Sequence, residues 1–220
     1  MTSMGSADTY KHQGLRRQLV KQLALKGIKN EKVLNAIENV PRHLFLDNAF
    51  LQFAAYEDKA FKIAAGQTIS QPYTVAYQTE LLEIVKGEKV LEVGTGSGYQ
   101  TSILLELGAK VYSIERQKVL FEKAKIMLDK LGYAPRLFFG DGYKGLPSFA
   151  PFDKIIVTAG APFVPDELLT QLKTGGILVI PVGDETVQKM ISIKKISASH
   201  FERKEHDNFS FVPLLENKAN

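Results

Sequence analysis

The feature that most constrains this chain is a regular alternation of short apolar runs with helical patterns, which begins near residue 89. Five runs are interpreted as buried strands, because each is short, apolar and bounded by turn-forming or charged residues. These runs are 89–93, 110–114, 136–139, 153–157 and 176–180. Helical patterns lie between them, at 100–107, at 120–131 and from Pro165. Strands that alternate with helices predict right-handed βαβ units, and hence an α/β fold with a doubly wound, Rossmann-like, mostly parallel sheet.

The two ends of the chain depart from this alternation. In the first third, leucines recur every fourth residue from Leu15 to Leu23, which predicts a helix. Asn30 is placed to cap a second helix, which Pro41 ends. Near the C-terminus, apolar and polar residues alternate around Ile191, and aromatic residues follow a charged region that is interpreted as a turn. We therefore expect N-terminal helices and an antiparallel C-terminal hairpin at the sheet edge.

The length of the chain fits one domain, and we interpret residues 1–220 in that way. About residues 1–65 would form a helical extension or lid, and about 66–220 the cofactor-binding core. The net charge of +4 is not concentrated in a basic patch, so no nucleic-acid partner is expected. No apolar run has the length of a membrane span, and the N-terminal residues lack a signal-peptide core. We therefore expect a cytoplasmic monomer with no membrane partner.

Cysteine and histidine usage excludes several kinds of site. The chain has no cysteine, which excludes disulfides, thiolate nucleophiles and cysteine-bound zinc. Its four histidines lie far apart in sequence, without metal-ligand spacing, so no metal site is expected. His43, in the segment VPRHLFLD, is interpreted as a structural residue.

The segment LEVGTGSGY follows the first predicted strand and opens a helix. Glycines there allow the backbone to approach a ligand closely, and a helix N-terminus favours an anionic group. The dinucleotide fingerprint requires glycine or alanine where Tyr99 stands, which argues against NAD. The spacing G-x-G-x-G, preceded by an acid, instead resembles the first motif of class I S-adenosylmethionine methyltransferases. The predicted cofactor residues in this segment are Glu92, Gly94, Thr95, Gly96, Ser97 and Gly98.

Two further acids end predicted strands. Glu115 lies 21 residues after Gly94 (115 − 94), where an acid is placed to bind ribose hydroxyls. The alternative is a solvated carboxylate at a strand end. Asp141, followed by Gly142, would face the crevice where such folds bind ligands, and its carboxylate could accept from an adenine amino group. An Asx turn is the alternative for Asp141, and the two roles are compatible.

The segment after the fourth predicted strand narrows the substrate class. Many methyltransferases that act on nucleic-acid amino groups carry Asp/Asn-Pro-Pro-aromatic there. This chain has TAGAP at 158–162, which argues against methylation of a base amino group. The absence of cysteine argues against methylation of a pyrimidine carbon.

Segments from nearly the whole chain resemble, in order, the bacterial branch of the protein-L-isoaspartate O-methyltransferases, which are protein-repair enzymes. They are VPRHLFLD (40–47), AYEDKAF (55–61), GQTISQPYTVA (66–76), LEVGTGSGYQ (91–100), YSIER (112–116), GDGYKGLP (140–147), PFDKIIVTAGAP (151–162), LKTGGILVIPVG (172–183) and FVPL (211–214). The glycine segment is common to many methyltransferases, whereas GQTISQP and TAGAP are more particular.

The resemblance implies methyl transfer from S-adenosyl-L-methionine to the α-carboxylate of L-isoaspartyl residues, and of D-aspartyl residues as a further substrate, in damaged proteins and peptides. The product of the cofactor would be S-adenosyl-L-homocysteine. The methyl ester then cyclises to a succinimide, which can reopen to aspartate. An ionised carboxylate is already a nucleophile, so the enzyme needs to position it rather than to remove a proton. The alternatives are a methyltransferase for a small molecule or RNA, and an NAD-binding oxidoreductase or silent nucleotide-binding module.

The resemblance also implies site residues. Ser70 would orient the substrate carboxylate by a hydrogen bond, and is the predicted catalytic residue. The residues at the reactive end of the cofactor would be Gln67, Thr68 and Ile69, and those near the bound peptide Val212, Pro213 and Leu214. Local sequence alone favours Ser70 as the N-cap of a helix with Pro72 in its first turn. Two positions depart from the family pattern: Leu215, where some relatives have Thr, and Asp184-Glu185, where a glycine-containing turn is expected.

Overall fold

The computed structural model describes residues 8–46 and 51–219. The first seven residues of the N-terminal segment, and Asp47 at the end of VPRHLFLD, therefore lie outside the described residues. Among the described residues, no helix combines the length and the apolar character that crossing a membrane requires.

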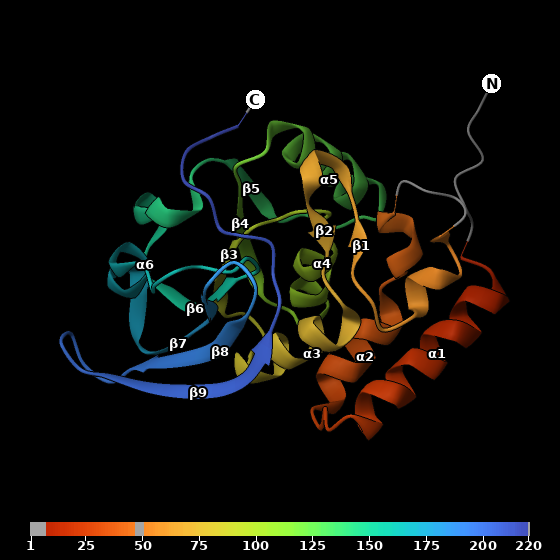
Figure 1. Cartoon of the computed structure of the whole chain (residues 1–220), viewed down its shortest axis with the longest axis horizontal. Helices are drawn as coiled ribbons and strands as arrows, with labels where there is room; N and C mark the ends of the chain where they lie inside the picture. Colours follow the sequence, from red (N-terminus) through yellow and green to blue (C-terminus); the bar gives the residue numbers. More distant parts are fainter. Residues whose placement is uncertain (1–7, 47–50, 220) are drawn as a thin grey trace.

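A seven-stranded sheet in the order β5-β4-β3-β6-β7-β8-β9 runs through the molecule (Figure 1). The strands are β3 (Lys89–Val93), β4 (Lys110–Glu115), β5 (Arg136–Phe139), β6 (Phe152–Val157), β7 (Leu172–Gly183), β8 (Gln188–Lys195) and β9 (Phe201–Phe209). The pairs among β3 to β7 are parallel, whereas β7-β8 and β8-β9 are antiparallel. This confirms the predicted α/β class with a mostly parallel sheet and antiparallel C-terminal strands.

One C-terminal prediction was wrong. The charged region expected to be a turn is β9 itself, and the turn lies before it, where the backbone N–H of Ile196 donates to the carbonyl of His200 (2.9 Å). Most residues of β9 are exposed, from Glu202 onward. An edge strand with solvent on both faces can carry charge at successive positions, so it has no apolar alternation to recognise.

Helices cover the sheet and complete the fold. They are α1 (Tyr10–Leu25), α2 (Glu31–Asn39), α3 (Pro72–Leu81), α4 (Tyr99–Glu106), α5 (Lys118–Lys130) and α6 (Asp166–Gln171), with the 3-10 turns η1 (Arg42–Phe45), η3 (Ala54–Tyr56), η4 (Ala64–Gly66), η5 (Gly142–Lys144) and η6 (Pro147–Phe149). As predicted, the Asn30 side chain caps α2 by accepting from the backbone N–H of Lys32 (3.0 Å). Gly132, with φ 77°, follows the C-cap of α5.

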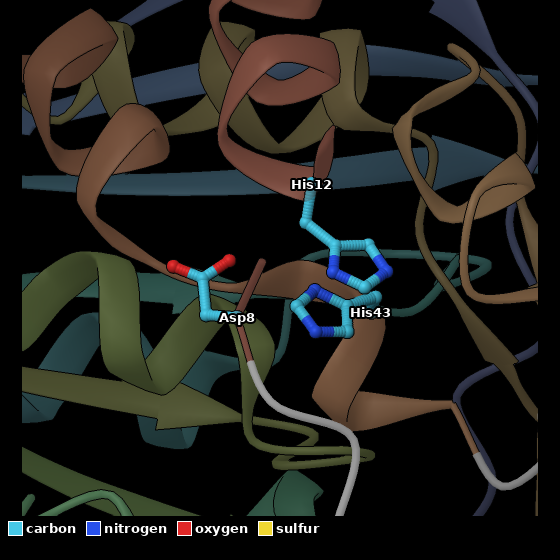
Figure 2. A group of neighbouring side chains, drawn as sticks. All are labelled: Asp8, His12 and His43. Carbon is cyan, nitrogen blue, oxygen red and sulfur yellow. The ribbon is translucent and has the colours of Figure 1, made fainter. Parts of the chain in front are cut away.

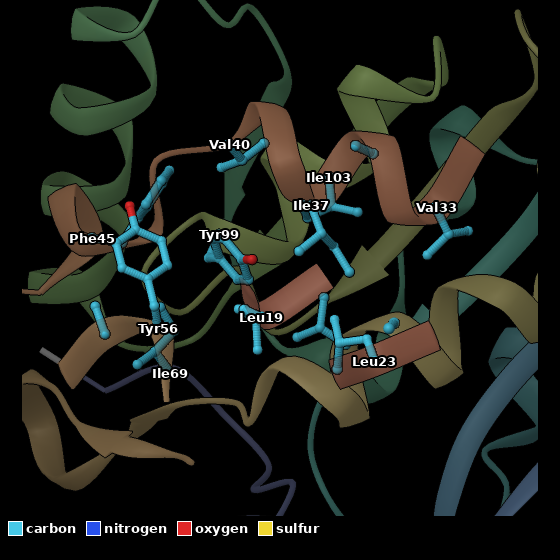
Figure 3. Packing of buried hydrophobic residues seen from close by; sticks show 14 of the residues in the cluster. Leu19, Leu23, Val33, Ile37, Val40, Phe45, Tyr56, Ile69, Tyr99 and Ile103 are labelled. Atoms are coloured by element: carbon cyan, nitrogen blue, oxygen red, sulfur yellow. The ribbon is translucent and has the colours of Figure 1, made fainter. Parts of the chain in front are cut away.

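The N-terminal helices are packed into the core rather than set apart from it. Leu19 and Leu23 of α1 are buried together with Ile37 of α2 and with Tyr99 and Ile103 of α4 (Figure 3). Figure 1 shows α1 and α2 side by side at one end of the molecule. The predicted leucine stripe is therefore the face that attaches these helices to the remainder of the fold.

A two-stranded hairpin carries the GQTIS segment. Its strands are β1 (Phe61–Lys62) and β2 (Thr68–Ile69), which pair antiparallel with Phe61 opposite Ile69. The connection η4 contains Ala65 at φ 56° and Gly66 at φ 67°, a left-handed pair that reverses the chain. The connection η4 contacts α5, and its residue Ala64 lines a small pocket together with Gly96 and Ser97, so the hairpin stands beside the turn that follows β3.

Candidate active site

The turn after β3 needs glycine for its shape. Gly94 has φ 99°, and a Cβ placed on it would lie 2.4 Å from Oγ1 of Thr158, at the end of the neighbouring strand β6. That hydroxyl lies 2.7 Å from the Gly94 carbonyl, to which it donates. The two strand ends are thereby joined, and the backbone of the turn is left uncovered toward the cavity beside it.

This cavity, here called the cofactor cleft, holds about 850 Å³ of space, including the solvent at its open mouth. It lies at the carboxyl ends of the parallel strands, where such folds bind ligands. Most of the predicted site residues line it: Gln67, Thr68, Ile69, Ser70, Gly94, Thr95, Gly96, Ser97, Glu115, Gly142, Val212, Pro213 and Leu214.

Glu115 ends β4 and presents a carboxylate at the wall of the cleft. One oxygen accepts from the backbone N–H of Gly96 (2.9 Å) and the other from that of Gln117 (2.8 Å). Burial raises the pKa of the Glu115 carboxyl, and these two donors act in the opposite direction. Each oxygen keeps a further lone pair, so the group can still accept from a ligand hydroxyl.

Glu92, a predicted cofactor residue, does not line the cleft. Its side chain is buried within the sheet and accepts from the hydroxyl of Thr101 (2.5 Å). Burial raises the pKa of Glu92 to about 8, so it is mostly protonated at neutral pH. Glu92, the acid before the glycines, points from β3 into the interior of the protein. There it supports the start of α4 by its hydrogen bond with Thr101.

Gly98, also predicted as a cofactor residue, lies outside the lining as well. It is the N-cap residue of α4, with φ 88°, and a Cβ there would lie 3.1 Å from the side chain of Leu128 in α5. This glycine therefore permits the close approach of two helices.

Asp141 is the third predicted residue that does not line the cleft. Its carboxylate accepts from the backbone N–H of Tyr143 (3.0 Å) and, through its other oxygen, from that of Asn217 (3.0 Å). The Asx-turn alternative thus describes its geometry, and its carboxylate serves to hold the C-terminal segment. Gly142, which follows it, does line the cleft, and a Cβ there would lie 2.5 Å from Val93.

Ser70 lies directly after β2 and is half-buried at the wall of the cleft. The expectation from local sequence that it caps α3 was wrong: the N-cap residue is Gln71, which makes no side-chain cap hydrogen bond. Pro72 does occupy the first turn, as predicted. In that turn, the backbone N–H of Tyr73 donates instead to the carboxylate of Asp58 (2.8 Å). An acid that is distant in sequence has replaced the local cap.

A second cavity, here called the peptide cavity, adjoins the cofactor cleft and holds about 1010 Å³ of space, including the solvent at its open mouth. Residues from α3 and from the segment that ends β9 form much of its wall. The residues that line both cavities are Thr68, Ser70, Thr158 and Val212. Ser70 therefore stands at the junction of the two cavities.

The segment after β9 is held against the end of β6. The backbone N–H of Gly160 donates to the carbonyl of Val212 (2.8 Å), and that of Leu214 donates to the carbonyl of Gly160 (2.7 Å). These bonds hold the TAGAP and FVPL segments side by side, because each supplies backbone partners to the other. Leu215 is 44% exposed and also lines the cofactor cleft.

Three residues at or beside these cavities were missed by the sequence reasoning. Thr158 was used only as part of the TAGAP motif and was given no role of its own, although its hydroxyl supports the glycine turn. Asp58 lies within the AYEDKAF segment but was given no role. Asp207 lines the peptide cavity and was hidden in the charged region interpreted as a turn.

The loop at Asp184 also differs from expectation, because it forms without glycine at that position. The Asp184 carboxylate accepts from the backbone N–H groups of Thr186 (2.7 Å) and Val187 (2.9 Å). These bonds lower the pKa of Asp184 to about 2, with the Thr186 side-chain hydroxyl as the largest cause. An aspartate turn takes the place of the expected glycine turn.

Two histidines that are far apart in sequence lie in contact. The rings of His12 and His43 stack with centroids 3.9 Å apart, and Asp8 stands to one side (Figure 2). One ligand atom of each of the three residues lies within 4.8 Å of the others, although their spacing gave no such signal. The Asp8 carboxylate already accepts from Arg16 through both oxygens (3.0 and 2.9 Å), and Tyr56 contacts the same guanidinium (3.1 Å). We interpret these five residues, the N-terminal polar cluster, as a structural network.

Comparison with known proteins decides the family. The family model described as "Protein-L-isoaspartate(D-aspartate) O-methyltransferase (PCMT)" matches residues 14–219. The chain belongs to this family. It is 66% identical to the protein-L-isoaspartate O-methyltransferase of Christiangramia forsetii over 212 residues, covering 96% of this chain and 99% of that protein. With the Cytophaga hutchinsonii enzyme of the same name it shares 60% identity over 208 residues, 94% of each chain.

Solved structures of the family have the same fold. A protein-L-isoaspartate O-methyltransferase superposes with a TM-score of 0.83 at 29% identity, covering 92% of this chain and 66% of that one. The Plasmodium falciparum protein, solved in complex with S-adenosyl-L-homocysteine, gives a TM-score of 0.80 at 24% identity, over 92% of this chain and 99% of that one. Membership of the protein-L-isoaspartate O-methyltransferases confirms the resemblance and the enzyme class predicted from the sequence.

The cofactor cleft fits the adenosyl ligand that methyltransferases use. Glu115 lines it at the end of β4, beside the glycine turn to which its carboxylate is hydrogen-bonded. Added Cβ atoms at Gly94 and Gly142 would collide with Thr158 and Val93, so glycine is needed at these two positions for the backbone to pack against its neighbours at the wall of the cleft. These are properties of a nucleoside site, and they rest on this chain's own residues.

Proposed function

We propose that this protein is a repair enzyme that transfers a methyl group from S-adenosyl-L-methionine to the α-carboxylate of L-isoaspartyl residues in damaged proteins and peptides, with S-adenosyl-L-homocysteine as the second product. The observation that carries this proposal is the meeting of the cofactor cleft and the peptide cavity at Ser70. Transfer between two ligands requires two adjoining spaces, and an extended peptide requires one that opens to the surface.

When bound, S-adenosyl-L-methionine supplies a methyl group on a positively charged sulfur. Around the nucleoside, the carboxylate of Glu115 would accept from ribose hydroxyls, and the backbone of residues 94–97, which donates to that carboxylate at Gly96, would form the adjoining wall. Gln67, Thr68 and Ile69 would line the reactive end, since the β1–β2 hairpin holds them beside that wall. Gly142 would lie near the base.

On the substrate side, the Ser70 hydroxyl would donate a hydrogen bond to the isoaspartyl carboxylate and orient it. A neutral donor fits this task because it fixes the carboxylate without the strong pairing that a guanidinium would give. No histidine, lysine or cysteine lines either cavity among the described residues. This agrees with a reaction that needs no general base, because the substrate carboxylate is already ionised at neutral pH. Catalysis then rests on positioning.

The peptide would continue past Ser70 along the segment 212–214. Val212 lines both cavities, while Pro213 and Leu214 line the cofactor cleft. The parallel bridge to Gly160 fixes this segment, so it offers a rigid wall to an extended chain.

Methyl incorporation into an isoaspartyl peptide and its aspartyl twin tests the proposal. We expect label in the isoaspartyl peptide, followed by appearance of the aspartyl form as the ester cyclises and reopens. Equal labelling of the twins would contradict the repair function. A third peptide that carries D-aspartate shows whether that residue is also a substrate, as the description of the family suggests.

We further propose that the enzyme works as a monomer in the cytoplasm, without a nucleic-acid or membrane partner. The chain has no cysteine, so folding needs no oxidising compartment. Light scattering across a range of concentrations tests the monomer, and a mass that doubles with concentration would contradict it.

A further inference from the structure

The peptide cavity has an aromatic wall. The ring of Tyr73, in α3, stacks on that of Phe209, at the end of β9, with centroids 6.3 Å apart and planes 21° apart. Tyr77, one helical turn after Tyr73, packs against the same phenylalanine at 5.2 Å. Aromatic faces of this kind accept the aliphatic stem and the charged head of a basic side chain.

One carboxylate stands beside that wall. Asp207 is exposed on β9 and is the single charged residue that lines the peptide cavity in the part of the chain that the structure describes. Burial, and after it the charge of Asp207, raises the pKa of Tyr77, which places the carboxylate near the aromatic rings. Within the described residues, no ion pair to Asp207 is formed.

The nearest other acid, Asp58, does not line the cavity and is already paired. It lies beneath Tyr73 with a side chain only 8% exposed, and Lys26, whose ammonium also lies 5.7 Å from the Tyr73 ring, pairs with it at 2.5 Å. Its oxygens also accept from Gln71 (3.1 Å) and from the backbone N–H of Tyr73 (2.8 Å). Among the described residues, Asp207 is therefore the acid of the cavity wall that forms no ion pair.

Taking the proposed function as its basis, we propose that Asp207 makes the peptide cavity selective for substrates that carry lysine or arginine beside the isoaspartyl residue. The stem of the basic side chain packs along Tyr73 and Phe209, and its charged head reaches the Asp207 carboxylate. The preference belongs to the peptide that flanks the reacting carboxylate, which itself remains at Ser70.

The sign of this preference separates it from the charge of the whole protein. A chain with a net charge of +4 attracts acidic peptides at long range. A local site at Asp207 favours the opposite charge. A preference for basic peptides can therefore not arise from the overall charge.

The test measures kcat/KM for two series of isoaspartyl peptides, with lysine, glutamine or glutamate placed directly before or directly after the isoaspartyl residue. We expect one series to rank lysine above glutamine above glutamate, with a total range of about three- to ten-fold, as an exposed charge pair with an aromatic contact gives. The range should shrink in high salt. Asp207→Asn should remove it, and Asp207→Lys should reverse it.

Glu205→Gln is the matched control. Glu205 is also an exposed acid of β9, but it pairs with Arg203 (3.2 Å) and does not line the cavity. It should keep the ranking of the wild-type enzyme. An equal kcat/KM across both series, or a ranking that Asp207→Asn leaves unchanged, would overturn the proposal. Failure of the proposed function would look different, since no isoaspartyl peptide would then be methylated above its aspartyl twin.

Discussion

The cofactor cleft and the N-terminal polar cluster both gather polar side chains inside the molecule, but they use them differently. In the polar cluster, Arg16 donates to Asp8 and to Tyr56, and the Tyr56 hydroxyl lies 2.5 Å from a ring nitrogen of His43. In the cleft, Glu115 and Ser70 keep hydrogen-bonding capacity toward a cavity. Groups whose bonds end inside the protein hold elements together, whereas groups that face a space are available to a ligand. Substitutions in the two regions should therefore change different properties of the protein.

The largest effect is expected beside the polar cluster, at Arg42. Its side chain is fully buried, donates to the carbonyls of Ala55 (2.9 Å) and Lys59 (3.2 Å), and lies 4.8 Å from the ring of Tyr99. Arg42→Met leaves those carbonyls without their donor and should lower the free energy of unfolding by about 3 kcal/mol, measured by urea denaturation.

The exposed Arg203 supplies the control, since Arg203→Met should change stability by less than about 0.5 kcal/mol. Arg42→Met should leave the affinity for S-adenosyl-L-homocysteine unchanged at a temperature where the variant is folded. A loss of affinity with unchanged stability would place Arg42 among the ligand-facing residues instead.

The next largest effect is expected at Glu115, in the cofactor cleft. Glu115→Gln keeps the size of the side chain but removes the charge that strengthens its bonds to ribose hydroxyls. We expect the Kd for S-adenosyl-L-homocysteine, measured by calorimetry, to rise about ten-fold, as for the loss of one charge-assisted hydrogen bond. Glu122→Gln, on the exposed face of α5, should not change it. An unchanged Kd in Glu115→Gln would remove this residue from the cofactor site.

Glu92 comes last, because its effect is visible only as a slope of stability against pH. Its folded-state pKa of about 8 lies above the ordinary value of 4.5. The folded state thus holds a proton that the unfolded state releases, so this contribution to stability is complete below the ordinary pKa and is lost as pH rises to about 8. Relative to Glu92→Gln, which mimics the protonated form, the wild-type protein should lose at most about 1.4 kcal/mol per pH unit in this window. Parallel stability curves for the two proteins would show that Glu92 is ionised in the fold.

The parts of the fold that depend on local pattern could be predicted from the sequence. The five parallel strands are short apolar runs because both faces of such a sheet are covered, and the glycine turn is dictated by backbone conformation. Strand β9 could not be predicted, since an exposed edge strand does not need the alternation of apolar and polar residues by which strands are recognised. The cap of α3 was assigned to Ser70 because local rules consider only neighbours, whereas Asp58 reaches it from another segment.

The site residues can be divided in the same way, into those that the sequence pattern predicts and those whose contacts depend on distant segments. The positions of Glu115, Gly94, Gly96 and Gly142 at the cleft could be predicted because topology gathers strand ends at one edge. Asp141 follows the same rule, but its carboxylate also accepts from the backbone of Asn217, a bond that only the folded chain makes possible. The stacking of His12 on His43 likewise depends on the packing of α1 against η1, and their separation in sequence contains no sign of it.

The central claim is that Ser70 acts on the substrate carboxylate from the junction of two cavities. The most direct test compares, in Ser70→Ala, the Kd for S-adenosyl-L-homocysteine with kcat/KM for an isoaspartyl peptide. We predict a fall of kcat/KM by about ten-fold or more, as for the loss of a positioning hydrogen bond, while Kd stays within about two-fold. A Kd that weakens as much as kcat/KM falls would contradict the account, because Ser70 would then belong to the cofactor.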